Sequence, residues 1–496
     1  MRVETEVLVI GSGVAGCSAA IAADRAGADV TVVTKASKPE DTNTWWAQGG
    51  IAKVADSNGD SPQEFAEDII EAGDGESDPE AVETLVEEGT QAVEEMLVEE
   101  FGAEFDESSN GYDLAKEGGH SERRVLHSGD ATGEAVHHAL LSRLDEREIE
   151  VLESHMALDL LTDDGEVTGA VVVDTEDDTT FPVSSGATVL ATGGIGDVYG
   201  HTSNPEGATG DGVAMAAFAD AEVDDMEYVQ FHPTVHAERE YLLSEALRGE
   251  GALLIDGDGE RFMPDYHEDA ELAPRDVVAV RVDEHRRETG EVYLDLSPVF
   301  ESCDFENEFP TAYDNLTDEE IEDRRVPVKP AEHFLCGGVV VDEHGRSSVE
   351  NLYAVGETAR TGVHGANRLA STSLLEGLTW GLRAGEDAAE NPSPPDGTDG
   401  EVDEFNGEMP ERFCEAKFER LQEIMWNKVG LRREEEELRQ ARTELQRLRG
   451  EVKSYARGRT DPGLYALRNA VVVGILITEA AIENDESVGC HRRVSA

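Results

Sequence analysis

Residues 6–34, EVLVIGSGVAGCSAAIAADRAGADVTVVT, contain the pattern that decides the fold. An apolar run at Glu6–Ile10 predicts a buried strand, a helix of small residues extends to about Ala26, and a second strand covers Asp29–Thr34. Between them lies a G-x-G-x-x-G turn, which lets a pyrophosphate approach the helix N-terminus. We therefore expect a βαβ unit that binds a dinucleotide, the alternative being a glycine motif used only for packing. The turn consists of Gly11, Ser12, Gly13, Val14, Ala15 and Gly16.

The end of the second strand departs from the usual dinucleotide pattern. A carboxylate normally stands there and binds the adenosine ribose, whereas this chain has Thr34 and Lys35. The difference disfavours ordinary NAD recognition and leaves open a flavin dinucleotide held by another side chain.

A second stretch, Asn351–Glu376, reads NLYAVGETARTGVHGANRLASTSLLE. It predicts a buried strand at Leu352–Val355, a glycine-rich loop after Glu357, and a helix from about Leu374. Backbone N–H groups at such a helix start favour an anion, and the planar fork of Arg368 suits a carboxylate. We interpret the stretch as the place where a cofactor and a carboxylate substrate meet. The alternative is an ordinary turn whose arginine pairs with a nearby glutamate.

Three other stretches carry site-like residues. Asp41–Ala52, DTNTWWAQGGIA, predicts a loop laid against a flat ligand, although a core aromatic patch explains the tryptophans equally well. Leu114–Gly133 gathers two His, two adjacent Arg and a Glu between glycine turns, which predicts a polar site or a charge-paired loop. Asp211 starts a small-residue helix, where it can bond a ribityl hydroxyl or merely cap the helix.

The charge balance excludes some classes of function. The 496-residue chain has 109 acidic and 40 basic side chains and a formal net charge of -69. Such a surface repels phosphate backbones and anionic membranes, so we expect no nucleic-acid or membrane partner. The acid excess is typical of a halophilic solvated surface.

Cysteine usage and hydropathy indicate the compartment. The five cysteines occur singly and without metal-ligand spacing, so we expect no metal site and a reducing cytoplasm. The longest apolar run near the C-terminus, Ala470–Ile477, is far shorter than the ~20 residues that span a bilayer. The N-terminus leads directly into a strand without a signal peptide, which predicts a cytoplasmic protein.

The order of predicted elements defines an α/β class: a doubly wound, Rossmann-like domain with an inserted α+β capping domain and a C-terminal helical domain. We expect the cofactor-binding domain at 1–224 and 338–390, the capping domain at 225–337, a linker at 391–402 and the helical domain at 403–496. Strands are predicted at Glu150–Leu161, Val167–Asp174, Thr179–Val183 and Thr188–Gly194, and helices at Ser61–Ala72, Asp78–Glu100, Phe405 to about Arg457 and Leu464–Asn484.

Taken together, ten motifs resemble the flavoproteins of the succinate dehydrogenase and fumarate reductase superfamily over essentially the whole chain. They are GSGVAG, TWWAQGGI, EGGHSxRRVLH, DATG, TGDG, QFHPT, EALRGEG, ELAPRDVVA, HFLCGG and HGANRLASTSLLE. The resemblance implies that the cofactor is FAD and that the Thr34 and Lys35 pair is normal.

Three features favour one branch of this superfamily, the one that oxidises L-aspartate. Asn43 occupies the position of the histidine that binds flavin covalently in the dehydrogenases, so FAD is expected to be non-covalent. Glu117 stands where dicarboxylate enzymes have an aromatic residue, and its carboxylate can pair with a substrate ammonium. The C-terminal helical region is short. The alternative is a soluble fumarate reductase or succinate dehydrogenase, and a rival from another class is a non-catalytic flavin-binding protein.

The resemblance also implies roles for individual residues. The substrate carboxylates are expected to meet His232, Ser244, His333 and Arg368, with Ser371 and Gln230 near the same site. Arg275 holds the position of the family's proton-transferring arginine, although a guanidinium is not deprotonated in proteins, so a carboxylate relay through Asp276, Glu260 or Glu245 would be required. FAD is expected to contact Ser12, Gly13, Val14, Ala15, Lys35, Asn43, Thr44, Trp45, Trp46, Ala47, Gln48, Gly49, Gly50, Asp211, Glu357, Ser373 and Leu374.

The reaction that the resemblance implies is oxidation of L-aspartate to iminoaspartate between the cofactor domain and the cap. Hydride leaves Cα for the flavin, and O2 or fumarate reoxidises the enzyme. In the family this is the first step of NAD synthesis, so a transient contact with quinolinate synthase is a further expectation.

Overall fold

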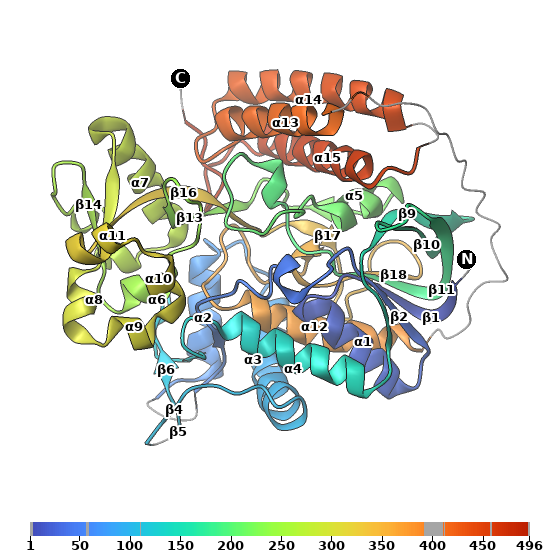
Figure 1. Ribbon diagram of the computed structural model, residues 1–496, viewed down its shortest axis with the longest axis horizontal. Helices are drawn as coiled ribbons and strands as arrows, with labels where there is room; N and C mark the ends of the chain where they lie inside the picture. Colours follow the sequence, from blue (N-terminus) through green and yellow to red (C-terminus); the bar gives the residue numbers. More distant parts are fainter. Residues whose placement is uncertain are drawn as a thin grey trace.

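The structure is a computed structural model that describes residues 3–55, 59–109, 111–390, 410, 412–456 and 459–494. A central sheet with helices on its faces lies toward the right of the molecule, a mixed α and β part projects at the opposite end, and three helices lie across the top (Figure 1). The predicted α/β class, with an α+β part and a C-terminal helical part, is confirmed. The predicted linker at 391–402 lies outside the described residues.

The central sheet has seven strands, in the order β8-β2-β1-β11-β10-β9, with β18 paired to the C-terminal half of β11. Strands β8, β2, β1, β11 and β18 are parallel, whereas β10 and β9 add an antiparallel edge. The bounds are β1 Val3–Ile10, β2 Val30–Val33, β8 Glu150–Leu152, β9 His155–Asp163, β10 Glu166–Asp174, β11 Thr180–Leu190 and β18 Leu352–Ala354.

Three predicted strands were wrong in their bounds. Glu150–Leu161 is two strands, because the chain turns at Ser154, whose φ is +56°, and β8 then pairs with β2 while β9 pairs with β10. Thr179–Val183 and Thr188–Gly194 belong instead to one strand, β11, which ends at Leu190. The intervening small residues stay in the sheet because Gly169 lets β10 approach closely: a Cβ at Gly169 would lie 2.0 Å from the oxygen of Val183.

Alternate residues of β1 explain the layers. Val7 and Val9 pack against helices α1 (Val14–Ala26) and α12 (Ser373–Ala388), whereas Leu8 and Ile10 face the opposite side with α5 (Asp211–Phe218). Because side chains of a strand alternate between faces, a continuous apolar run is what a strand buried on both faces requires. Helix α12 runs against α1, so the loop that carries Arg368 lies beside the glycine turn.

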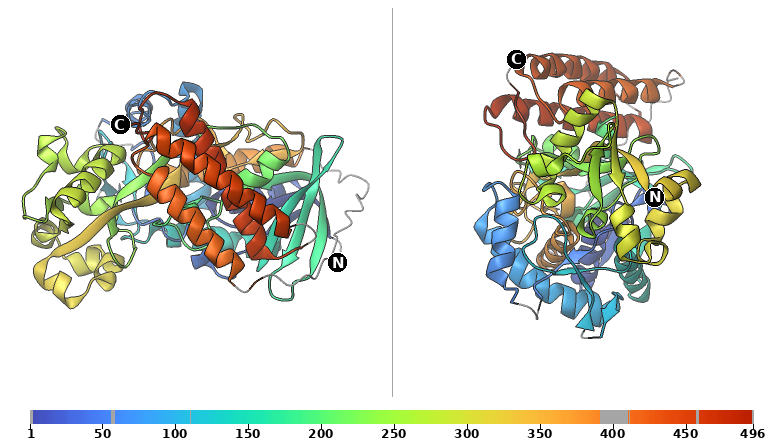
Figure 2. Two further views of the ribbon diagram at one scale, coloured as in Figure 1. Left: turned by 90° about the horizontal axis from the view of Figure 1, so that it is seen from above. Right: turned by 90° about the vertical axis from the view of Figure 1, so that its left-hand side faces the viewer.

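Further helices cover the α1 and α12 side of the sheet (Figures 1 and 2). The predicted helix Asp78–Glu100 begins at Pro79 with Asp78 as its N-cap and changes to π-helical geometry at Ala92. These elements are α2 Pro62–Ala72, α3 Pro79–Gln91, η2 Ala92–Glu100 and α4 Thr132–Glu146, with short strands β3 Ile51–Ala52, β4 Glu107–Ser108, β5 Gly111–Tyr112, β6 Leu114–Ala115 and β7 Val125–Leu126.

Residues between β12 and β17 form the projecting part, which has its own apolar cluster. It is built on a four-stranded antiparallel sheet in the order β13-β16-β15-β14. The division at 224/225 and 337/338 stays a prediction. The strands of this sheet are β13 Val229–His236, β14 Leu253–Asp256, β15 Val292–Asp295 and β16 Arg325–Leu335, and the helices are α6 Glu245–Gly249, α7 Arg275–Thr289, α8 Ser297–Ser302, α9 Phe305–Glu308, α10 Pro310–Asn315 and α11 Asp318–Asp323. A separate small sheet is formed by β12 Val223–Asp224, β17 Gly338–Val340 and β19 Ala359–Arg360.

The C-terminal part consists of α13 (Phe413–Lys428), α14 (Glu435–Ala456) and α15 (Pro462–Glu483), which cross the molecule together (Figure 2). The first predicted helix is therefore two helices separated at 429–434, and its predicted start at Phe405 lies outside the described residues. Among those residues, α15 alone is long and apolar enough to cross a membrane, but 61% of its most apolar window is buried in the protein, which is typical of a core helix.

Candidate functional site

A long cavity begins at the glycine turn and ends among charged side chains of the projecting part. The space between its walls is about 1700 Å³, open solvent included. Gly11 has a φ of +116°, and a Cβ there would lie 2.0 Å from the carbonyl oxygen of Ala191, so only glycine fits. The N-cap of α1, Gly13, has no side chain, and although the Val14 N–H donates to Thr44 Oγ1 at 2.9 Å, the other N–H groups at this helix start can meet an anion. The turn therefore fits a dinucleotide pyrophosphate.

Lys35 and Asp211 meet across the cavity wall, at 2.7 Å between Nζ and Oδ2. The Asp211 Oδ1 atom accepts hydrogen bonds from Thr209 Oγ1 and from Asn469 Nδ2 of α15, both at 2.9 Å. Gly210, not Asp211, is the N-cap of α5. Asp211 thus has protein donors on both oxygens while its residue still lines the cavity.

Glu357 and Asn43 lie opposite the glycine turn. Glu357 Oε1 accepts from the backbone N–H of Leu335 at 3.0 Å, and Oε2 accepts from Asn43 Nδ2 at 3.3 Å. Burial raises the pKa of Glu357 to about 7, against the lowering effects of the Leu335 N–H and Arg368. A carboxylate held in this way accepts hydrogen bonds from ligand hydroxyls.

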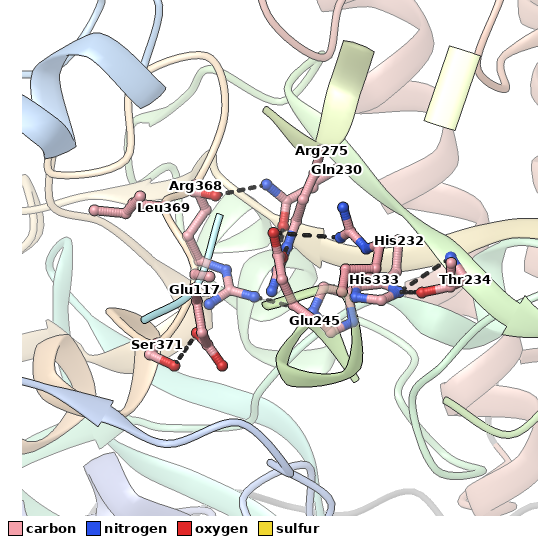
Figure 3. A network of polar contacts seen from close by, with 12 residues as sticks. Glu117, Gln230, His232, Thr234, Glu245, Arg275, His333, Arg368, Leu369 and Ser371 are labelled. Carbon is pink, nitrogen blue, oxygen red and sulfur yellow. Dashed lines mark hydrogen bonds and ion pairs between the residues drawn. The ribbon is translucent and has the colours of Figure 1, made fainter. Parts of the chain in front are cut away.

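Arg368 anchors the charged end of the cavity (Figure 3). Its Nη1 donates to Ser373 Oγ at 3.1 Å, its Nη2 donates to His333 Nε2 at 2.9 Å, and its Nε is buried without a partner among the described residues. Burial, together with the charge of Arg275, lowers the pKa of Arg368 to about 10, so the side chain stays cationic. A cation with an unsatisfied buried donor points to an anionic ligand, because leaving such a group unpaired costs about 1–3 kcal/mol.

Glu376 of α12 fixes the loop that carries Arg368. Glu376 accepts a hydrogen bond from His364 Nε2 at 2.8 Å and another from Thr361. Ser371 sits in the left-handed region with a φ of +60°, a conformation that costs a non-glycine residue about 1–3 kcal/mol. This geometry directs the Ser371 hydroxyl to Glu117.

His232 and His333 face one another, with ring centroids 5.0 Å apart. Since Arg368 donates to His333 Nε2, the other nitrogen, Nδ1, carries the proton and donates to Ser203 Oγ at 2.7 Å. His232 Nδ1 accepts from the Thr234 N–H at 3.3 Å, which leaves Nε2–H as a donor. Burial, then the charge of Arg275, lowers the pKa of both rings well below the ordinary value, so both are neutral.

Arg275, the first residue of α7, is fixed by two partners. Its Nε donates to Glu245 Oε2 at 2.6 Å, and its Nη1 donates to Gln230 Oε1 at 3.0 Å. Burial raises the pKa of Glu245, but the charges of Arg248 and Arg275 outweigh it and the net shift is downward. Glu245 is thus an ionised carboxylate between two arginines.

Of the three carboxylates considered as relay partners of Arg275, Glu245 is the one that contacts it. Glu260 is exposed, and Asp276 accepts from Asn367 Nδ2 at 3.2 Å. The structure therefore supports Glu245 and neither of the others as the partner of Arg275.

Glu117 lies on the other side of the cavity, 2% exposed, and accepts a hydrogen bond from Ser371 Oγ at 2.5 Å. A Cβ on Gly49 would lie 2.3 Å from Glu117 Oε1, so the glycine makes room for this carboxylate. Burial and the charge of Glu245 raise the pKa of Glu117, against the opposing effects of Ser371, Arg275 and Arg368. This buried carboxylate thus faces the same cavity as Arg368, Arg275 and His232.

Most of the predicted site residues line this one cavity. Three do not. Gly16 packs beneath the turn, since a Cβ there would lie 2.0 Å from the Gly11 oxygen; Trp45 stacks edge-on against His138; and Gln230 stands behind Arg275. Those in the lining are Gly11, Ser12, Gly13, Val14, Ala15, Lys35, Asn43, Thr44, Trp46, Ala47, Gln48, Gly49, Gly50, Glu117, Asp211, His232, Ser244, Arg275, His333, Glu357, Arg368, Ser371, Ser373 and Leu374.

Sequence reasoning missed Ser203 and Asn204, which also line the cavity. Ser203 bonds His333, and Asn204 Oδ1 accepts from Asn43 Nδ2 at 2.8 Å. The loop that carries them joins β16 through the Ser203 N–H and the Glu332 oxygen, at 2.9 Å. Gly200 and Gly207 flank them and indicate a turn, but nothing in the sequence marks this serine and asparagine as facing a ligand.

Comparisons with known proteins agree with this geometry. The family model described as "FAD binding domain" matches residues 6–374, and "Fumarate reductase flavoprotein C-term" matches residues 418–495. The L-aspartate oxidase of Halobacterium salinarum is 54% identical over 99% of this chain and 96% of its own length, and that of Streptomyces coelicolor is 42% identical over 99% and 88%. A quinol-fumarate reductase structure with menaquinol superposes with a TM-score of 0.88 at 28% identity, covering 100% of this chain and 93% of that one.

The fold and the cavity thus define an FAD-dependent flavoprotein of the succinate dehydrogenase and fumarate reductase superfamily. Within that superfamily, the chain belongs to the L-aspartate oxidase family.

Proposed function

We propose that this protein is an FAD-dependent oxidoreductase that oxidises L-aspartate to iminoaspartate. Relatives that share up to 54% of its residues over nearly the whole chain are L-aspartate oxidases. The observation that supports the substrate most directly is Glu117, a buried carboxylate that faces the same cavity as Arg368. L-aspartate carries an ammonium that can pair with this carboxylate, whereas succinate and fumarate carry none.

The carboxylates of the substrate would be held by donors from both parts of the molecule. Arg368 offers a guanidinium, His232 offers Nε2–H, and the Ser244 hydroxyl is buried without a partner among the described residues. Unpartnered polar groups at one end of a cavity bind an anion without first breaking protein hydrogen bonds. The ammonium would then face Glu117.

The cofactor residues proposed from the sequence fit FAD. The Gly11 turn accommodates the pyrophosphate, while Glu357 and Asn43 face the ligand hydroxyls. Since the side chain at position 43 is an amide and not an imidazole, FAD would be held non-covalently. When bound, FAD supplies the hydride-accepting ring.

The protein's own groups would then position aspartate and set the charge around it. Glu117 draws the amino group toward Ser371, and Arg275, held by Glu245 and Gln230, keeps a positive charge near the substrate. A guanidinium passes on a proton only where a carboxylate relay replaces it, and aspartate oxidation needs no proton delivered to carbon, so the part of Arg275 in that reaction would be orientation and charge. The neutral His232 adds a donor without adding charge, and the neutral His333 accepts from Arg368 and holds that guanidinium in place.

Replacing Glu117 with glutamine tests the substrate assignment. The variant Glu117→Gln keeps the shape and the Ser371 contact but removes the charge that pairs with the ammonium. We expect kcat/KM for L-aspartate to fall by about 100-fold, equivalent to about 2.7 kcal/mol, with a far smaller change for succinate or fumarate. Steady-state kinetics with the three substrates check this. An unchanged ratio between aspartate and succinate would contradict the role of Glu117.

The pH dependence of aspartate oxidation should carry the signature of the same residue. Burial raises the pKa of Glu117, and below that pKa the protonated side chain cannot pair with an ammonium. We therefore expect kcat/KM for aspartate to fall on the acid side at a pH above the ordinary glutamate range. The Glu117→Gln variant should lose this acid limb.

Glu357, whose pKa is about 7, titrates in both proteins, so the profiles are compared at saturating FAD. The two active-site histidines are neutral throughout this range and do not produce the limb. An identical acid limb in the variant would assign the titration to another group.

The biological setting follows from the chemistry. We propose that fumarate or O2 accepts the electrons, that the reaction is the first step of NAD synthesis, and that the protein works in the cytoplasm. Because iminoaspartate is an unstable imine, direct transfer to a quinolinate synthase is part of the same proposal.

A further inference from the structure

A second cavity lies on the opposite side of α5 from the charged site, between β9, α5 and the C-terminal helices α14 and α15. The four elements lie together in the upper part of Figure 1. The space between the walls is about 1090 Å³, open mouth included. Its walls include Met215, Val452, Val471 and Val472, and Phe218 lies beside it, 38% exposed. The cavity is thus apolar inside and reaches solvent.

Positive charges surround this apolar interior. Arg449 and Lys453, one turn apart on α14, line the cavity, are exposed and form no ion pair with any described residue. On the same helix Arg439 pairs with Glu435 and Arg447 pairs with Glu451. Arg442 of the same helix also has no ion pair with a described residue, but it lies outside the cavity lining. The location of Arg449 and Lys453 at an apolar wall indicates an external anion.

Arg468 of α15 adds a third, fixed cation. Its Nη1 lies 2.9 Å from Asp159 Oδ2, and its Nη2 donates to the Leu158 oxygen, also at 2.9 Å. The guanidinium lies over the Phe218 ring, 4.6 Å from its centroid. These contacts hold a planar cation against an aromatic ring at the edge of the cavity.

We propose that this cavity binds an organic anion with an apolar body, the head group at Arg449 and Lys453 and the body against Phe218 and the valines. The apolar walls gain by removing a hydrocarbon or aromatic surface from water. The cations are required because the net charge of -69 otherwise repels an anion from this protein.

The cavity is also coupled to the FAD site, a statement that rests on the proposed cofactor function. Met215 lines both cavities. Arg468 Nε donates to Asn469 Oδ1 at 3.1 Å, and Asn469 Nδ2 donates to Asp211 Oδ1, whose residue lines the FAD cavity. Through these contacts an anion in the second cavity would change the affinity for FAD, and FAD would change the affinity for the anion by the same factor, because coupling between two sites is reciprocal.

The test uses the FAD-loaded enzyme and 8-anilinonaphthalene-1-sulfonate, an anion with an aromatic body, titrated by calorimetry. We expect one saturable equivalent for the wild-type protein. The double variant Arg449→Glu with Lys453→Glu should bind about tenfold more weakly, since two attractive contacts become repulsive. Arg442→Glu, on the same helix but outside the cavity lining, is the matched control and should bind as the wild type does.

Equal affinity in the wild type and the double variant, or equal weakening by Arg442→Glu, would overturn the assignment of the site. The coupling is measured separately, as the Kd of FAD for the apoprotein with and without saturating sulfonate. We expect a change of about fivefold in the wild type and none in the double variant. Normal anion binding with an unchanged Kd for FAD would overturn the coupling and leave the site standing. Loss of aspartate oxidation in other variants would affect neither result.

Discussion

Arg368→Leu is expected to abolish aspartate oxidation while the protein keeps its FAD. The guanidinium bridges His333 and Ser373 and leaves Nε for a substrate carboxylate. Removing one partner of a buried charge pair costs about 3–5 kcal/mol, which is a loss of about 10²- to 10⁴-fold in kcat/KM. The glycine turn is untouched by the change, so the flavin spectrum should persist.

Arg368→Lys is the matched control for this result. Lysine keeps the positive charge but not the planar fork, so we expect part of the activity to return. The measurements are kcat/KM for L-aspartate and the flavin content of each purified variant. Aspartate oxidation at the wild-type rate in Arg368→Leu would remove Arg368 from the substrate site.

Arg275→Gln should separate the two reactions that the site supports. Reduction of fumarate needs a proton delivered to carbon, whereas aspartate oxidation releases a proton from the amine. We expect fumarate reduction to fall by about 10³-fold or more, the scale of lost acid catalysis, and aspartate oxidation by about 10- to 100-fold through lost orientation. Both rates are measured with the same preparation.

The comparison depends on the local contacts of Arg275. Glu245 and Gln230 would remain in place, since Glu245 also lies 3.2 Å from Arg248. Arg275→Lys keeps the charge and should retain more aspartate oxidation than Arg275→Gln. Equal losses in both reactions would mean that Arg275 acts by orientation alone in each.

The parts of the fold that could be predicted are those written in short, local patterns. The glycine turn at Gly11 was found because a strand, three glycines and a helix follow one another within a few residues, and the same holds for Leu352–Arg368. Strand β11 was predicted as two strands, Thr179–Val183 and Thr188–Gly194, because small residues separate its apolar ends. Its small residues at 184–187 read as a turn, yet β1 and the close approach of β10 at Gly169 keep them in the sheet.

The parts that could not be predicted depend on segments distant in the chain. Glu245, Glu260 and Asp276 were equivalent as sequence, and only the packing of α6 against α7 brings Glu245 to Arg275. Ser203 was missed because the glycines that flank it indicate only a turn, and its loop reaches the site by pairing with β16. Glu117 was proposed from a resemblance, and the structure places it beside Ser371, more than 250 residues away.

The central claim, that the charged cavity is built for an amino dicarboxylate beside FAD, is tested most directly by an anaerobic titration of the purified flavoprotein. Without oxygen, reduction of the flavin is seen as loss of its absorbance at about 450 nm. L-aspartate is expected to bleach the flavin, and succinate, added at the same concentration, is expected to do so far less. Bleaching by succinate with no response to L-aspartate would show that the cavity is not built for an amino dicarboxylate.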